Sequence, residues 1–198
     1  MQYEFFIVLV FSKIIANIAY CDLRYMKKNQ QMKPQDIVLL LKIISINTDL
    51  WEQKPIAESL EMSQSEVSES VARSKYAGLL NPKGKTVMKH GLLEFLAHGL
   101  AYVFPQKPGP IVRGIPTSHS AYPLNAMIQS NEVYVWPYAK GTVKGHSIEP
   151  LYKSVPQAVL KDEKLHALLA LADAIRVGRA REKEMAITEL KNRILNGE

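Results

Sequence analysis

The chain has 198 residues, of which 47% are hydrophobic and 22% charged, and its formal net charge is +6 at pH 7. A chain of this length can bury a hydrophobic core and is expected to form one or two globular domains. The positive charge favours an anionic partner. The single cysteine, Cys21, excludes an intramolecular disulfide and fits a reducing, cytoplasmic location.

An apolar run, Phe5–Ala19, lies near the start of the sequence. It is similar to a signal peptide, but the preceding MQYE carries no positive charge and Lys13 interrupts the run. The run is also too short to span a bilayer. We therefore expect no membrane anchor, an extension of doubtful structure at residues 1–31, and a first domain that begins at Met32.

The first predicted helix spans Pro34–Ile46. Pro34 suits a first helical position because its φ is preset and it has no amide hydrogen, and Asp36 in the first turn interacts favourably with the helix dipole. An apolar stripe indicates burial: Ile37, Leu40, Leu41 and Ile44. Trp51, in the connection that follows, is expected in the core, with a DNA or partner contact as the alternative.

Residues Lys54–Leu80 predict two short helices joined by a tight turn. Ser63 opens the second helix and Glu66 follows three residues later, which is a capping box in which each side chain bonds the other residue's amide. Val67 and Val71 lie one turn apart and can face the first helix. This pattern is typical of a helix-turn-helix. The alternative is an ordinary packed helical hairpin.

The stretch IAESLEMSQSEVSESVARSKYAGLL, residues 56–80, resembles the DNA-binding core of bacterial winged-helix regulators, the MarR-like group in particular. The resemblance covers about Pro34–Tyr102. It implies a transcriptional regulator that binds double-stranded DNA with the helix at about Ser63–Tyr76 in the major groove. Two residues depart from the family pattern. Glu61 stands in the turn where many members carry glycine, and Glu69 puts an acid on the expected DNA face.

If Val67 and Val71 pack inward, a helical wheel points the opposite side of this helix outward. The outward residues are then Ser65, Ser68, Glu69, Ala72 and Arg73, with Gln64 at the leading end. We predict that Gln64 reads adenine and that Arg73 reads guanine or holds a phosphate. Glu69 either accepts from cytosine or lowers non-specific affinity. No acid interrupts the basic run from Arg73 to Lys89. The predicted DNA-binding residues are Gln64, Ser65, Ser68, Glu69, Arg73, Lys75, Lys83 and Lys85.

After residue 80, proline and glycine mark a turn. A helical pattern at Val87–Gly99 leaves little room for a β-hairpin wing, so a short basic loop is expected instead. His90 and His98 on this helix are too far apart in sequence for a metal pair, and no metal site is expected. Ala101–Phe104 is predicted to be a short strand.

Prolines and glycines crowd Phe104–Pro116, which predicts irregular structure there. We place at this stretch the boundary between a DNA-binding domain at 32–104 and an α+β partner or oligomerisation domain at 105–198. Glu132–Trp136 alternates like a strand, and Gly141–Ile148 is expected to pair with it as a hairpin across the turn at Pro137–Lys140.

Four polar residues of this middle region are the candidates for catalysis: Ser118, His119, Ser120 and His146. No nucleophile elbow, phosphate loop or metal cluster accompanies them in the sequence. We therefore expect no catalytic site, no cofactor and no enzymatic activity. Four aromatic residues leave a ligand or peptide pocket open as an alternative to packing: Tyr122, Tyr134, Trp136 and Tyr138.

Two helices are predicted at the end of the sequence, Glu163–Val177 and Arg179–Leu195. Their apolar residues exceed what a single helix seam needs: Leu165, Leu168, Leu169, Leu171, Ile175, Met185, Leu190, Ile194 and Leu195. Since one recognition helix covers only a few base pairs, we expect a homodimer built through this apolar face. The alternative is that these residues cover the β element of the same chain.

The strings RGIPTSHSAYPL, VWPYAKGTVKG, IEPLYKSVPQA and RVGRARE resemble small bacterial helix-turn-helix proteins encoded beside nucleotidyltransferase-type toxin genes. The resemblance implies a regulator in a toxin or defence operon. The alternative function is an antitoxin-like protein–protein adaptor whose partner protein is the toxin. The expected fold is mostly α, of the α+β class, with a winged-helix-like domain, a small β element and C-terminal helices.

Overall fold

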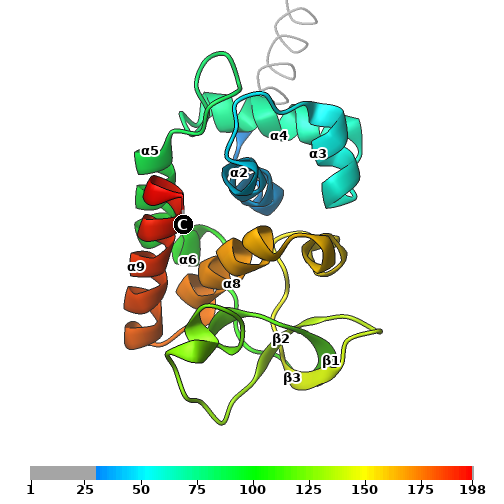
Figure 1. Ribbon diagram of the computed structural model, residues 1–198, viewed down its shortest axis with the longest axis vertical. Coiled ribbons are helices and arrows are strands. Elements are labelled where there is room, and N and C mark those ends of the chain that lie inside the picture. Colours follow the sequence, from blue (N-terminus) through cyan, green and yellow to red (C-terminus); the bar gives the residue numbers. More distant parts are fainter. Residues whose placement is uncertain (1–29, 198) are drawn as a thin grey trace, which may run out of the picture. The chain divides into compact units, whose positions relative to one another are not determined.

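The computed structural model describes residues 30–197, and the prediction for residues 1–31 therefore falls almost entirely outside the described residues. Helix α2, Pro34–Ile46, lies at the centre of the remaining chain (Figure 1). Every side chain from Ile37 to Leu41 is buried, because α2 packs against one helix on each side. It ends at Asn47, which adopts the left-handed conformation with φ 53°.

Helices α3, Gln53–Leu60, and α4, Gln64–Tyr76, form the predicted pair. Glu61 ends α3 with φ 52°, the left-handed conformation for which glycine would carry no steric cost. The predicted capping box is confirmed. The Glu66 amide donates to Ser63 Oγ at 3.2 Å, and the Ser63 amide donates to Glu66 Oε2 at 3.0 Å.

A loop at residues 81–86 follows α4, closed by a single antiparallel bridge between Leu80 and Val87. One continuous helical stretch then runs through α5 (Lys89–Glu94), a π-helical turn η1 (Phe95–Gly99) and α6 (Leu100–Val103). The strand predicted at 101–104 is therefore wrong. The reason lies in a buried stripe with a spacing of four residues, which continues the helix to its end: Leu92, Leu96 and Leu100.

Three short strands make a closed sheet: β1 (Ile111–Pro116), β2 (Tyr134–Pro137) and β3 (Val143–Ser147). Strand β1 pairs antiparallel with both β2 and β3, and these two pair with each other in parallel. Two predictions are corrected here. Part of the stretch expected to be irregular is β1, and β2 and β3 pair as expected but in parallel, so they are not a hairpin across Pro137–Lys140.

Gly114 explains why β1 forms in a sequence rich in structure breakers. A Cβ atom at this position would lie 2.0 Å from the carbonyl oxygen of Trp136, so only glycine allows the two strands to approach this closely. Short 3-10 turns then lead from β1 toward β2, η2 at Ser118–Ser120 and η3 at Leu124–Ala126.

The C-terminal part contains α7 (Val155–Ala158), the 3-10 turn η4 (Val159–Lys161), α8 (Glu163–Val177) and α9 (Ala180–Asn196). Helix α8 is surrounded by α2, α6, α9 and η2, which is why its sequence shows no single apolar stripe. The apolar residues assigned to a two-fold interface are mostly buried inside the same chain, from Leu165 to Ile175 and at Leu190 and Ile194. That assignment is wrong, because these residues are already buried where α8 and α9 pack on each other and where α8 packs on α2, α6 and η2.

Polar contacts hold α8 in place at both ends. Asp162 caps α8 by accepting from the Leu165 amide at 2.9 Å, and it forms an ion pair with Lys42 of α2 at 2.7 Å. Near the other end, buried Asp173 accepts hydrogen bonds from Trp136 Nε1 at 2.6 Å, from a threonine hydroxyl and from Arg176.

From Lys33 onward the chain forms one compact unit. The boundary expected at residue 104 therefore does not separate two bodies, since α2 from the first segment packs on α8 from the second. No helix within residues 30–197 combines the length and the apolar character needed to cross a membrane.

Candidate nucleic-acid interface

Helices α3 and α4 lie at one end of the compact unit, and the sheet lies at the other (Figure 1). Val67 and Ser70 are fully buried, and together with Val71 and Ser74 they form the inner face of α4. The opposite face is exposed over the length of the helix: Gln64, Ser65, Ser68, Glu69, Ala72 and Lys75. The predicted outward placement of Gln64, Ser65, Ser68, Glu69 and Ala72 agrees with the structure.

Arg73 is the exception, and its predicted outward placement is wrong. Its side chain is only 2% exposed, and the guanidinium forms a two-pronged ion pair with Asp36, with Nε 2.9 Å from Oδ2 and Nη2 2.6 Å from Oδ1. The hydrogen bond with Asp36 raises the pKa of Arg73 above its ordinary value. Arg73 thus joins α4 to the start of α2 and does not face solvent, where a base or phosphate would lie.

Two neighbours complete the contacts around this ion pair. Ser70 donates a second short hydrogen bond to the Asp36 carboxylate. Glu69, whose side chain is 58% exposed, lies with Oε2 3.4 Å from Arg73 Nη1. The Glu69 carboxylate, on the outward face of α4, therefore lies close to the buried guanidinium of Arg73.

The basic loop at residues 81–86 is anchored through Lys85. Its Nζ donates to the Trp51 carbonyl at 2.6 Å and lies 4.7 Å from the Trp51 ring centroid. The Trp51 indole donates in return to the Lys85 carbonyl at 2.7 Å. Trp51 is buried as predicted, and Lys85, although exposed, anchors the loop to it. Lys83 remains exposed next to the loop tip.

The loop rests on one flank of α4. Gly84 has φ +71°, and a Cβ atom there would meet Lys75 Cδ at 3.2 Å and Val71 Cγ1 at 3.3 Å. Lys75 and the loop that carries Lys83 therefore lie together on this side of the helix. The structure thus brings two of the predicted basic residues, Lys75 and Lys83, to one edge of the outward face.

A contact that the sequence did not predict lies on the other flank. The Tyr152 hydroxyl donates to Glu66 Oε1, and the Ser154 hydroxyl donates to the carbonyl of Leu60 at the end of α3. The Tyr152 bond, followed by the bonds from Ser63 and finally the charge of Lys153, lowers the pKa of Glu66 from 4.5 to about 2. Burial and the same carboxylate raise the pKa of Tyr152 to about 12.

Three of the four polar residues considered for catalysis bond backbone groups, and the buried hydroxyl of the fourth, Ser118, has no hydrogen-bond partner within residues 30–197. His119 Nε2 lies 2.8 Å from the Glu132 carbonyl, and His146 Nδ1 lies 3.0 Å from the Gly109 carbonyl. Ser120 accepts from the Tyr134 amide at 2.9 Å. In the part of the chain that the structure describes, none of the recorded hydrogen bonds joins Ser118 or Ser120 to a histidine ring.

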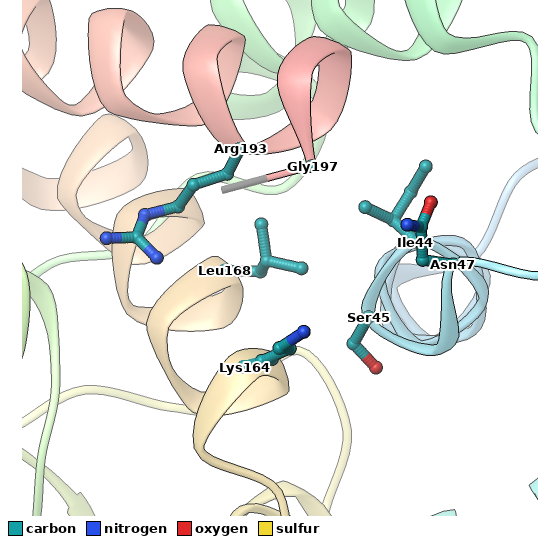
Figure 2. Close-up of a pocket in the computed structure, with 7 residues that line it drawn as sticks. All are labelled: Ile44, Ser45, Asn47, Lys164, Leu168, Arg193 and Gly197. Carbon is teal, nitrogen blue, oxygen red and sulfur yellow. The ribbon is translucent and has the colours of Figure 1, made fainter.

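The aromatic residues proposed to line a pocket do not share one environment. Trp136 and Tyr134 are buried in the core, whereas Tyr122 is 62% exposed. A small cavity of about 30 Å³ lies elsewhere, between the end of α2, α8 and the end of α9, and Figure 2 shows Ser45, Lys164 and Leu168 around it. A volume of this size holds about one water molecule. That cavity is too small for an organic ligand, whereas an open hollow of about 730 Å³ lies beside His119, Ser120 and Glu132.

Within residues 30–197, histidine, cysteine and carboxylate side chains form no group of three that is placed to hold a metal ion. The face of α4 that carries Gln64, Ser65 and Ser68 is polar and exposed, and Lys75 and Lys83 lie at its edge. Comparisons with protein-family models, with curated proteins and with solved structures give no match for this chain.

Proposed function

We propose that this chain is a sequence-specific transcriptional regulator that binds double-stranded DNA by placing α4 in the major groove. The observation that supports the proposal most is the uncovered polar face of α4 beside a docked basic loop. A major groove admits one α-helix, and sequence is read there by side chains that reach base edges.

The side chains on this face suit that role. The Gln64 amide both donates and accepts, as a bidentate contact with adenine requires. Ser65 and Ser68 can bond phosphates or bases, and Glu69 can accept from the amino group of cytosine. Lys75 and Lys83 supply the sequence-independent attraction to the DNA backbone.

Arg73 has a different part in this proposal. Its ion pair with Asp36 fixes the rotation of α4 relative to α2, so it is a positioning residue for the DNA-binding face. Lys85 likewise positions the loop through Trp51. The remaining direct contacts are Gln64, Ser65, Ser68, Glu69, Lys75 and Lys83.

In this proposal the loop at residues 81–86 takes the place of a wing, and the domain belongs to the winged-helix, MarR-like type of regulator. A homodimer on a pseudo-palindromic site stays a prediction. It needs a surface other than the buried apolar residues of α8 and α9.

The test uses fluorescence anisotropy with duplex fragments of the DNA upstream of the coding sequence of this protein. We expect one fragment to bind at least about a thousand-fold more tightly than a scrambled duplex of equal length, within the usual range for specific regulators. Equal affinity for every duplex, or none, would contradict the proposal.

An antitoxin-like adaptor is the second candidate function. It is favoured by apolar side chains exposed at the end of α6, where Tyr102 is 85% and Val103 51% exposed, since such side chains suit a protein partner. Retention on heparin separates the two functions. A DNA-binding protein elutes at elevated salt, whereas an adaptor without DNA affinity is not retained.

A further inference from the structure

The connection between β3 and α7 contacts the helix-turn-helix at two points. Tyr152 bonds Glu66 in the first turn of α4, and Ser154 bonds the carbonyl of Leu60 at the end of α3. Ser154 is buried and Tyr152 half-buried, so the backbone of this short segment is held against the turn between the two helices.

Lys153 lies between these two anchors and is exposed. Its Nζ is 5.9 Å from the centroid of the Tyr152 ring, and its charge acts on Glu66. Lys153 therefore lies beside the first turn of α4 and is exposed to solvent, and within residues 30–197 it forms no ion pair with an acidic residue.

The positions around α4 place this lysine opposite the basic loop. At about 100° per residue, Glu66 and Lys75 lie about 180° apart around the helix, and nine residues separate them by about 14 Å along its axis. Ser65, Ser68 and Ala72 lie on the outward face between these two flanks. The loop with Lys83 rests on the Lys75 flank, and Lys153 lies on the Glu66 flank.

A helix in the major groove has a phosphate backbone on each side. We propose that Lys153 is a further DNA-backbone contact, on the flank of α4 opposite to Lys75 and Lys83, which binds a phosphate on the strand opposite to the one bound by Lys83. This inference rests on the proposed function. Tyr152 and Ser154 are its positioning residues, and Tyr152 also donates a hydrogen bond to Glu66, whose carboxylate lies on the same flank of α4.

The experiment measures affinity against salt concentration for the full chain and a mixed-sequence DNA duplex. The variants are Lys153→Ala, Lys83→Ala and, as a matched control, Lys140→Ala, an exposed lysine in the β2–β3 connection. Each lost phosphate contact lowers the magnitude of the slope of log affinity against log salt by about 0.9. We expect this decrease for Lys153→Ala and for Lys83→Ala, about twice as much for the double variant, and no change for Lys140→Ala.

The outcomes separate this inference from the proposed function. If the wild type binds with a salt-dependent affinity and Lys153→Ala keeps the wild-type slope while Lys83→Ala loses part of it, Lys153 is not a contact and the inference is overturned. An equal decrease in all three variants would also overturn it, because net charge alone would explain the data. If the wild type does not bind DNA at all, the proposed function itself fails.

Discussion

Asp36 and Arg73 form the buried ion pair between α2 and α4, with exposed fractions of 0% and 2%. Burial of a charge without its partner is costly, because the protein interior solvates it poorly. Periodicity within α4 could not reveal this pair. The helical wheel of α4 places Arg73 at the edge of the outward face. Arg73 is buried because α2 packs against this edge, and a helical wheel contains no information about a neighbouring helix.

Replacing Arg73 by methionine keeps the volume of the side chain and leaves Asp36 buried without its cation. We expect Arg73→Met to lower the free energy of unfolding by about 3–5 kcal/mol. Lys75→Met, the same type of change at an exposed site two residues later, should change it by less than about 0.5 kcal/mol. Urea denaturation followed by circular dichroism measures both, and equal effects would show that the buried pair contributes no more than a surface lysine.

The free energy of unfolding depends on pH through Glu66. Its pKa is lowered from 4.5 to about 2, first by the Tyr152 hydroxyl, so the unfolded state binds more protons than the folded state between these values. The stabilisation from Glu66 is complete above about pH 4.5 and is lost as the pH falls toward 2. Tyr152→Phe should raise the pKa of Glu66 toward 4.5, and an NMR titration of the Glu66 carboxyl measures it. An unchanged pKa would show that Tyr152 does not bond this carboxylate in solution.

At the scale of elements, the sequence predicts the features that depend on a few neighbouring residues, such as helix caps and amphipathic helices. The capping box of Ser63 and Glu66 was recognised from two residues, and the helices that bury one stripe were recognised from their period. The sequence does not predict β1, because glycine and proline within a short stretch are typical of turns and irregular structure. Gly114 is in fact required by the backbone of Trp136, and no local pattern shows which distant strand will approach so closely.

Gly114→Ala tests this explanation of the sheet. The new Cβ atom would lie 2.0 Å from the Trp136 carbonyl oxygen, so we expect a loss of about 1–3 kcal/mol in the free energy of unfolding. Gly91→Ala in α5 is the matched control, because the nearest atom is 3.8 Å away and alanine favours a helix by about 0.5–1 kcal/mol. Thermal melting should therefore shift in opposite directions. A stabilising Gly114→Ala would contradict the close approach.

At the scale of the whole molecule, the predicted helix-turn-helix segment and the C-terminal helices share one core. Lys42 pairs with Asp162, and Tyr152 bonds Glu66, across long stretches of sequence. Such contacts leave no trace in hydrophobic periodicity, so the sequence suggested two domains and an apolar surplus for a dimer. The same contacts bring the β3–α7 connection beside α4, and thus add a candidate DNA contact that the basic run alone did not contain.

The central claim is that the outward face of α4 reads DNA sequence, and Gln64→Ala tests it most directly. The measurement compares wild-type and variant affinities for the best-bound upstream duplex and for a scrambled duplex at one salt concentration. We predict that the variant loses about 1–3 kcal/mol of binding free energy on the specific duplex, as expected for a lost bidentate base contact, and keeps its affinity for the scrambled one. An equal loss on both duplexes, or no loss on either, would contradict the claim.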